Sequence, residues 1–398
     1  MSSNPDRSGL SASELALQLR EFLAEHHPGR TPRSTSPLAA AERLVFQKAW
    51  QATLAEHGWA APGWPRRWGG MGLPLRLQAV HHRELAVART PVAPSRIGGI
   101  VGPALLGYGT APQLERFMGP LIRADELWCQ GFSEPDAGSD LASLRTRAVP
   151  DGSDYRLTGR KVWTSGAHFA DWMLCLARTG PAGSGAAGIT ALVVDMHAPG
   201  VTARPLRDMT GGAHFAEVEL DDVVVPATDR IGAENTGWAV ARATLGHERS
   251  TSLASSGMRY RRVTGDLLEL ARRRGRTVDA YDRDALARAV TGARLLEWSG
   301  QRVLARVLEG GEPGPLASVI RLQHALFEQG LHELATDLLG AQGALAPADE
   351  HLTAGGKHDG AWLRGFLRTR ASTIGAGTAE IQRNTIADRV LGLAEVWR

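Results

Sequence analysis

The sequence predicts an α+β multidomain protein in which a helical segment, a β segment and a second helical segment follow one another. Apolar residues recur at helical spacing up to about residue 125 and again from about residue 237. Between these stretches, apolar and polar residues alternate with the period of a β-strand. The length of 398 residues also exceeds what one hydrophobic core usually serves. We therefore expect three domains, at residues 1–126, 127–232 and 233–398.

The first domain is expected to consist of helices. Ser11 and Glu14 form a capping box that predicts a helix start, after ten polar residues that we expect to be frayed. A linker rich in Pro, Ser and Arg precedes a second helix, from Pro37 to Glu56, which Gly58 ends at the C′ position. After an irregular glycine-rich stretch, helical spacing predicts three further helices, at Leu75–Arg89, Gly99–Tyr108 and Pro112–Ile122.

The second domain has the pattern of β-strands. Asp151 and Gly152 predict a hairpin turn, and the residues from Tyr155 alternate after it. The run Gly188–Met196 is rich in β-branched residues and predicts a buried strand, and alternation returns at Glu217–Leu220. Because no helix intervenes between these short strands, a compact antiparallel sheet or barrel is expected. The third domain is again helical, with long segments predicted at Trp238–Arg274, Asp282–Leu308, Leu316–Leu339 and Thr378–Gly392.

The composition excludes several classes of protein. The 45 basic and 42 acidic residues leave a net charge of +3, which indicates neither nucleic-acid binding nor an acidic tail. The two cysteines, Cys129 and Cys175, lack the spacing of metal ligands and indicate a reducing compartment. There is no secretory signal and no apolar run of membrane-spanning length. We therefore expect a cytoplasmic protein without a metal site and without a membrane or nucleic-acid partner.

The first candidate ligand-binding segment is Gln130–Asp140, with the sequence QGFSEPDAGSD. The hydroxyls of Ser133 and Ser139 and the backbone N–H groups near Gly138 are hydrogen-bond donors for a closely bound ligand. By itself such a loop is more often an ordinary Asx-type turn.

The second candidate segment is Lys161–Gly166. Trp163 and Ser165 are two residues apart on a predicted strand, so their side chains are expected on one face. They could stack on a flat ring and hydrogen-bond its edge, although a core tryptophan is the favoured interpretation of this segment by itself, in a chain with 11 Trp.

The third candidate segment runs from Thr373 to Gly392. Its glycine-rich turn opens a helix, so it presents N–H donors and the positive end of the helix dipole to an anion. Thr378 is equally well explained as the N-cap of that helix, and the two interpretations are compatible.

Together these segments resemble the acyl-CoA dehydrogenase family. The match comprises the joined Ser-Glu-Pro and Ala-Gly-Ser-Asp of the first segment, the Lys-x-Trp-x-Ser of the second and the Gly-Thr turn of the third. The resemblance covers about residues 40 to 395. It implies the acyl-CoA dehydrogenase fold, with an N-terminal helical domain, a small antiparallel β-domain and a C-terminal four-helix bundle. It is closest to the actinobacterial type that acts on bulky acyl-CoA thioesters such as steroid side chains.

The resemblance implies FAD as the cofactor. It assigns Arg274 to the partner subunit's cofactor, although the Phe-Gly that follows this arginine in the family is lost here. Asp337 replaces the glutamine that begins another family segment, and its charge would be repelled by the pyrophosphate. The implied FAD-binding residues are Gln130, Phe132, Ser133, Gly138, Ser139, Trp163, Thr164, Ser165, Arg274, Gly340, Gly377, Thr378, Ala379 and Glu380. The implied substrate-binding residues are Ser139, Arg249, Ala376 and Gly377.

The position expected for the catalytic base differs from that in one branch of the family. Medium-chain acyl-CoA dehydrogenases carry their catalytic glutamate directly before the Gly-Thr, where this sequence has Ala376. Isovaleryl-CoA dehydrogenase instead places it before an arginine on the first helix of the C-terminal domain. Glu248 and Arg249 occupy that position here, which implies that Glu248 is the base. A Glu-Arg pair on a helix is otherwise usually a solvated surface feature.

The implied activity is the α,β-dehydrogenation of an acyl thioester, on CoA or on a carrier protein. An electron-transfer flavoprotein is the implied electron acceptor, and the assembly is expected to be a homo- or hetero-dimer or tetramer. One alternative is an acyl-CoA oxidase or flavin monooxygenase on the same fold. The other is a non-catalytic subunit that completes a partner's site in a heteromer.

Overall fold

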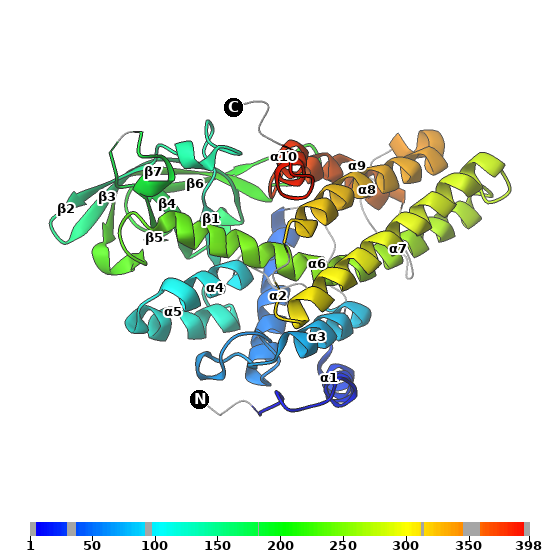
Figure 1. Cartoon of the computed structure of the whole chain (residues 1–398), viewed down its shortest axis with the longest axis horizontal. Helices are drawn as coiled ribbons and strands as arrows, with labels where there is room; N and C mark the ends of the chain where they lie inside the picture. Colours follow the sequence, from blue (N-terminus) through cyan, green and yellow to red (C-terminus); the bar gives the residue numbers. More distant parts are fainter. Residues whose placement is uncertain are drawn as a thin grey trace. The chain divides into compact units, whose positions relative to one another are not determined.

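The computed structural model describes residues 5–29, 37–91, 98–181, 183–311, 314–344 and 359–393, with the side chains of 37–40, 98, 245–258, 344 and 359–360 left aside. The order of elements is helical, then β, then helical, as predicted (Figure 1). The chain divides into two compact units, which are described separately. One comprises Met1–Glu84 with Ala88–Glu248, and the other Leu85–Val87 with Arg249–Arg398.

The N-terminal part of the first unit is helical, and its helix ends follow the predicted signals. The Ser11 hydroxyl accepts the N–H of Glu14 at 3.2 Å, and the Glu14 carboxylate accepts the N–H of Ser11 at 2.8 Å. Gly58 has a φ of 66°, and its N–H bonds the Ala55 carbonyl beyond the end of the second helix. The helices are α1 Ala12–His26, α2 Pro37–Glu56, α3 Leu75–Ala88, α4 Gly98–Tyr108 and α5 Ala111–Arg123.

The expectation of a frayed N-terminus is wrong for the residues from 5 to 10, whereas residues 1–4 lie outside the described part. Arg7 is only 9% exposed. Its guanidinium donates to the Gly58 carbonyl at 2.9 Å and lies 3.9 Å from the centre of the Trp59 ring. A cation over an indole face is attracted by the ring quadrupole. This contact fixes the segment ahead of α1, and the local sequence does not signal it.

The middle part of the first unit is a sheet of eight strands among the described residues. Their order is β6-β7-β3-β2-β4-β5-β8, with β1 beside β4. The predicted antiparallel sheet is confirmed, although β4 pairs in parallel with β1 and β2. The hairpin at Asp151 and Gly152 is also confirmed, because Asp151 pairs with Asp154. The strands are β1 Trp128–Gly131, β2 Arg147–Asp151, β3 Asp154–Ser165, β4 Trp172–Arg178, β5 Ile189–Asp195, β6 Val201–Leu206, β7 Phe215–Pro226 and β8 Arg230–Ile231.

Strand β4 was not predicted. Its residues Met173–Ala177 are all fully buried, so both faces of the strand are covered. A strand buried on both faces reads as a continuous apolar run rather than an alternating one, and the period of two is lost.

Helix α5 anchors the N-terminal helices to the sheet. The Gln113 side-chain amide donates to the carbonyls of Thr228 at 2.6 Å and Arg230 at 2.9 Å. The Phe117 ring lies edge-on to the indoles of Trp128 and Trp172, with centroids 5.2 and 5.3 Å apart. These contacts explain why helices and sheet form one unit.

The second unit contains most of the C-terminal helices, and four of its segments match those predicted within two or three residues at each end. The segment that was missed, α9, contains two glycines that weaken a helical pattern. Gly365 is required there, because a Cβ would lie 2.1 Å from the His332 ring. The helices are α6 Gly237–Arg273, α7 Ala280–Leu308, α8 Leu316–Leu339, α9 Asp359–Thr369 and α10 Ala379–Arg389, with α6 beginning in the first unit.

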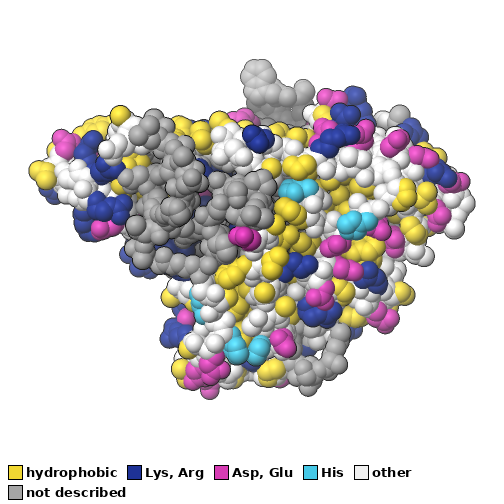
Figure 2. All heavy atoms as spheres, turned by 180° about the vertical axis from the view of Figure 1, so that it is seen from behind, with side chains coloured by type: hydrophobic (Ala, Val, Ile, Leu, Met, Phe, Trp, Pro, Cys, Tyr) yellow, Lys and Arg dark blue, Asp and Glu magenta, His cyan; other side chains and the backbone are white. Residues whose placement is uncertain are grey.

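The surface agrees with the balanced composition. Figure 2 shows basic and acidic side chains interspersed on the face that it draws. Within the described ranges, no helix is both long and apolar enough to cross a membrane.

Candidate functional site

The first candidate segment leaves strand β1 as a tight, hydrogen-bonded loop. Glu134 and Ala137 exchange two backbone hydrogen bonds, at 3.0 and 3.2 Å, across the Pro-Asp turn. Phe132 is buried and Gln130 and Ser133 are half-buried, whereas Gly138 and Ser139 are exposed. The loop therefore holds its beginning in the core and presents its Gly-Ser end to the surface.

A buried ion pair joins this loop to strand β3. The Lys161 side chain is fully buried, and its Nζ donates to Glu134 Oε1 at 2.8 Å and to the Phe132 carbonyl at 3.3 Å. Glu134 also accepts the backbone N–H groups of Arg145 at 2.6 Å and Thr146 at 2.9 Å. Burial raises the pKa of the Glu134 carboxyl, but the Lys161 charge and these hydrogen bonds outweigh it and leave the pKa below its ordinary value.

The Glu134–Lys161 pair fixes the first and second candidate segments to each other. A backbone hydrogen bond of 2.9 Å from Val162 to the Ser133 carbonyl adds to it. Neither charged residue was predicted to belong to the site. The available signal was that each lies inside one of the two motifs, but sequence alone does not reveal that they pair.

The second candidate segment places an aromatic ring at the surface. Trp163 is 62% exposed, so the alternative of a core tryptophan is excluded. Its φ of 58° is unusual for a residue other than glycine, and the pairing of β3 with β7 is irregular between Lys161 and Thr164. One edge of the indole meets the Phe215 ring, with centroids 5.8 Å apart. Ser165 is exposed as well, whereas the Thr164 side chain is fully buried, which leaves only its backbone for a ligand.

The third candidate segment is the turn before helix α10. Thr378 is the N-cap of this helix, since its hydroxyl accepts the N–H of Ile381 at 3.2 Å. The preceding Ala376 and Gly377 both have positive φ, at 53° and 88°. A Cβ on Gly377 would lie 2.5 Å from the Gln382 amide nitrogen, which can shift because it ends a flexible side chain, so the φ of 88° is the reason that glycine is favoured there. The first N–H groups of a helix have no intrahelical acceptor, which suits them to an anion. Ala379 is buried and Glu380 is exposed.

Two further predicted residues lie together in the second unit. Arg274, directly after α6, hydrogen-bonds the side chain of Gln342 in the 3₁₀ helix Gly340–Ala344. Gly340 has a φ of 60° and caps α8, because its N–H bonds the carbonyls of Thr336 and Asp337. The Asp337 side chain is exposed. The assignment of Arg274 to a partner subunit's cofactor stays a prediction.

The predicted base lies on helix α6. The backbones of Glu248 and Arg249 are helical there, and their side chains lie outside the described part. Just before them, Thr244 is fully buried and donates its hydroxyl proton to the Val240 carbonyl at 2.7 Å. Glu248 ends the first unit and Ala376 belongs to the second, so each is described within its own unit.

The fold and these segments define a class of oxidoreductase with a β-domain between two helical regions. Models of the N-terminal, middle and C-terminal domains of acyl-CoA dehydrogenase match residues 12–125, 129–223 and 235–391. The acyl-CoA dehydrogenase IpdE1 of Mycobacterium tuberculosis is 39% identical over 387 residues, which cover 96% of this chain and 97% of that protein. The chain belongs to the acyl-CoA dehydrogenase family, and the match begins well before residue 40.

Solved structures agree with this assignment. The structure described as "Tcur3481-Tcur3483 steroid ACAD" has a TM-score of 0.82 at 28% identity, covering 96% of this chain and 97% of that one. The ChsE4-ChsE5 complex from Mycobacterium tuberculosis has a TM-score of 0.78 at 29% identity, covering 97% of this chain and 99% of that one. The predicted acyl-CoA dehydrogenase fold is thereby confirmed, and the chain is an oxidoreductase of this family.

Members of this family are flavoproteins, and the residues present fit a flavin. An exposed indole with an exposed hydroxyl two residues further on offers a flat apolar wall with a polar edge. The Gly-Ser end of the first loop offers donors at the surface, and the N-terminus of α10 suits a phosphate. Within the first unit, the exposed indole and the loop suit an aromatic ring, and within the second unit, the N-terminus of α10 suits an anion.

Proposed function

We propose that this chain catalyses the FAD-dependent α,β-dehydrogenation of an acyl thioester to the 2-enoyl thioester. The observation that carries the proposal is the exposed Trp163, fixed beside the Ser133–Ser139 loop by the buried Glu134–Lys161 pair. An exposed indole alone is not informative, since Trp298 is 56% exposed as well, but Trp163 differs because a buried ion pair fixes it next to a loop rich in donors.

FAD is held by three groups of residues in this proposal. Gln130, Phe132, Ser133, Gly138 and Ser139 line it from the first loop, and Trp163, Thr164 and Ser165 from strand β3. Gly340, Gly377, Thr378, Ala379 and Glu380 contact it from the helical C-terminal part, and Arg274 reaches the cofactor of a partner subunit. When bound, FAD supplies the acceptor for the hydride that leaves the β-carbon.

The chain's own residues activate the α-carbon. An α-C–H beside a thioester is a weak acid, so its removal requires a nearby base and hydrogen bonds to the carbonyl oxygen. Glu248 takes the α-proton, and the backbone N–H of Ala376 hydrogen-bonds the thioester oxygen as negative charge develops on it. Alanine in place of the glutamate of the medium-chain enzymes removes a carboxylate but leaves the backbone N–H. The hydrogen-bond donor at residue 376 is therefore kept. Ser139, Arg249 and Gly377 help to bind the thioester.

The substrate in this proposal is a bulky acyl thioester with CoA as its carrier. Support comes from the relatives, since one solved structure is described as a steroid ACAD and names two chains, and another is the ChsE4-ChsE5 complex. By the same reasoning we propose a homo- or hetero-oligomer that passes its electrons to an electron-transfer flavoprotein in the cytoplasm.

A flavin-reduction assay tests the proposal. The purified chain should be yellow and release FAD on denaturation, and anaerobic addition of a suitable acyl-CoA should bleach the flavin absorbance. Rapid reoxidation by air would indicate an oxidase or monooxygenase instead. A colourless chain that gains activity only with a second subunit would favour the non-catalytic subunit, the alternative that Ala376 suggests. A colourless chain that stays inert with every such subunit contradicts the proposal.

A further inference from the structure

The turn that leads to Ala376 is anchored from one side by helix α8. Nη2 of Arg321 donates to two carbonyls of this turn, that of Ser372 at 2.9 Å and that of Gly375 at 2.6 Å. A guanidinium holds its donors in a rigid planar fork, so it fixes the two carbonyls relative to each other. Gly375 directly precedes Ala376, and its carbonyl and the N–H of Ala376 belong to one planar peptide group.

A buried carboxylate anchors the same turn from a position about two helical turns further along the same face of α8. Glu328 is 7% exposed, and its Oε2 accepts the Ser372 hydroxyl at 2.7 Å. Its Oε1 accepts a hydrogen bond from Nη2 of Arg259 at 2.5 Å. Burial raises the pKa of Glu328, but Arg259, the Ser372 hydroxyl and nearby histidines outweigh it, so the pKa stays below its ordinary value and the group is ionised at neutral pH.

Arg259 connects this anchor to another helix. It lies on α6, eleven positions after Glu248. The chain of contacts from Arg259 through Glu328 to Ser372 therefore joins α6 and α8 to the turn within the second unit. Charge-assisted bonds of this kind are roughly twice as strong as neutral ones.

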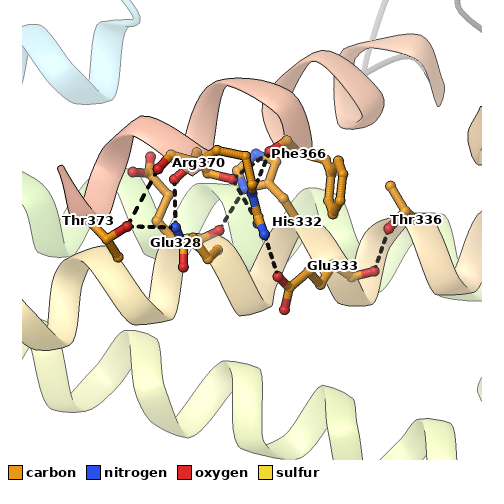
Figure 3. A network of polar contacts seen from close by, with 9 residues as sticks. Glu328, His332, Glu333, Thr336, Phe366, Arg370 and Thr373 are labelled. Carbon is orange, nitrogen blue, oxygen red and sulfur yellow. Dashed lines mark hydrogen bonds and ion pairs between the residues drawn. The ribbon is translucent and has the colours of Figure 1, made fainter. Parts of the chain in front are cut away.

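Two more contacts from α8 hold the segment before the turn (Figure 3). The Gln329 amide donates to the Thr369 carbonyl at 3.1 Å and to the Thr373 hydroxyl at 3.2 Å. Glu333 accepts from Arg370 at 2.7 Å, and Arg370 also donates to the carbonyl of Phe366 within α9. Glu333 thus ties α8 to the end of α9, whereas Arg321 and Glu328 act on the turn itself.

Ala376 needs such anchoring because its backbone is unusual. Its φ of 53° lies in the left-handed region, which residues with a Cβ seldom occupy. A residue in this region keeps its conformation only when its surroundings fix it. Residues 374–377 are exposed, so packing over their side chains does not supply that constraint. The N–H groups of Ile374 and Gly375 donate to the Ala371 carbonyl at 3.0 and 2.9 Å, and the bonds from α8 fix the Gly375 carbonyl on the other side of that residue.

We propose that Arg321 and Glu328 are positioning residues that fix the peptide between Gly375 and Ala376, and with it the direction of the Ala376 N–H. The inference rests on the proposed function, in which this N–H hydrogen-bonds the thioester oxygen. Arg321 acts directly on the Gly375 carbonyl. Glu328 acts through the Ser372 side chain and couples the turn to helix α6.

The test compares Arg321→Met, Arg321→Lys and Ser372→Ala with Glu333→Gln as the matched control. Hydrogen exchange of a peptide that covers residues 373–380 reports the order of the turn without any activity. Single-turnover flavin reduction at saturating acyl-CoA reports the chemical step separately from substrate affinity. FAD content and thermal unfolding are measured for every variant.

For Arg321→Met we expect faster exchange at residues 375–377 and a rate of flavin reduction that falls roughly 10- to 100-fold, because a misplacement of about 1 Å can cost a factor of about 100. The thioester concentration for half-saturation should change much less. Arg321→Lys should recover part of the rate. Ser372→Ala, which removes one hydrogen bond and leaves the fold intact, should slow reduction a few-fold, and Glu333→Gln should match the wild type in both readouts.

Several outcomes overturn the inference. One is unchanged exchange at 375–377 in both Arg321→Met and Ser372→Ala. Another is faster hydrogen exchange together with wild-type rates of flavin reduction in both variants, which would mean that the direction of the Ala376 N–H does not matter. A loss in Glu333→Gln equal to that in Ser372→Ala would indicate a general structural effect. If the wild type binds no FAD or reduces no thioester, the proposed function fails, while the exchange data still decide whether Arg321 and Glu328 order the turn.

Discussion

The two parts of the proposed FAD site are held in place in different ways. In the β-domain, the Ser133–Ser139 loop and Trp163 extend from paired strands, and the buried Glu134–Lys161 pair ties them together. In the helical C-terminal unit, the turn before Ala376 is exposed, and a few side chains of helix α8 hold it. The first part is fixed by its backbone ladder and a satisfied buried charge. The second is fixed by two short-range backbone bonds to the Ala371 carbonyl and by single side-chain bonds from α8.

This difference predicts how each part responds to substitution. A strand ladder contains many backbone hydrogen bonds, so no single exposed side chain decides its position. A turn held by Arg321 and Glu328 depends on particular side chains, and its geometry can change without unfolding the protein. Substitutions in the β-domain should therefore act through stability, and substitutions around the turn through the rate.

The largest effect is expected at Glu248, which belongs to neither of the two FAD-holding parts. Glu248→Gln keeps the shape of the side chain but removes the proposed base, and this typically costs roughly 10²–10⁴ in rate. FAD content and thioester binding should stay at wild-type levels, as measured by flavin absorbance and by titration. The double variant Glu248→Gln with Ala376→Glu should recover some flavin reduction, because it moves a carboxylate to the turn. If Glu248→Gln alone reduces the flavin at nearly the wild-type rate, Glu248 is not the catalytic base.

The next largest effect is expected at the buried ion pair of the β-domain. Glu134→Ala leaves the fully buried Lys161 without its counter-charge, which should destabilise the fold by about 3–5 kcal/mol. FAD should be lost in parallel, because both candidate segments lose their common anchor. Urea unfolding and flavin content provide the measurements.

The matched control for that pair is Glu219→Ala on strand β7. Glu219 pairs with Arg204 at 2.7 Å on the surface of the same sheet, where such pairs contribute about 0–1 kcal/mol. Equal destabilisation by Glu134→Ala and Glu219→Ala would show that burial of the pair is unimportant.

A smaller effect is expected from pH, and in the helical C-terminal unit it should come from His324. Burial lowers the pKa of His324 to about 4, against the attraction of Glu328 and with a smaller contribution from Arg321 and Arg259. The unfolded chain binds a proton near pH 6.5 and the folded chain only near pH 4, so stability is complete above 6.5 and falls as the pH drops toward 4. The loss for this group is on the order of 3 kcal/mol when it is complete.

The pH effect also separates the two parts. The Glu134 carboxyl has a lowered pKa, so the stability from its pair is present above the unfolded pKa and is lost only at more acidic pH. Between about pH 6 and 5, the Glu134–Lys161 pair should therefore stay intact while hydrogen exchange accelerates in α8. Faster exchange near β3 in this range would come from the half-buried His168, whose pKa is also lowered by burial, and not from the pair. His324→Gln should flatten the pH dependence of unfolding, and an unchanged slope in that variant would contradict this assignment.

The smallest effect is expected for Arg274→Ala. This side chain hydrogen-bonds Gln342 near the surface, and we expect it to reach a partner subunit's FAD. Its loss should lower FAD retention several-fold and weaken the oligomer without unfolding the helices. Flavin content and sedimentation measure both. Arg272→Ala is the control, because Arg272 lies two residues earlier at the exposed end of α6 and pairs with Glu269. Full flavin content in a monomeric variant would exclude the interface role.

The sequence by itself determined the features that depend on neighbours along the chain. The capping box at Ser11, the end of α2 at Gly58, the hairpin at Gly152 and the limits of the long C-terminal helices all follow from residues within one turn of each other. The three candidate ligand-binding motifs are of the same kind, because a glycine-rich turn or an alternating strand is encoded locally. Local patterns of this kind are sufficient to indicate the fold class and the family.

Only the tertiary structure decided which distant segments meet. The pairing of Glu134 with Lys161, the anchoring of the Gly375 carbonyl by Arg321 and the contact of Arg7 with Trp59 each join residues 27 or more positions apart. Strand β4 and helix α9 were missed because full burial on both faces or glycine at a close contact removes the local pattern. The spacing of apolar residues in a segment indicates which of its faces is buried. Which distant residues cover that face or pair with its charges depends on the tertiary structure.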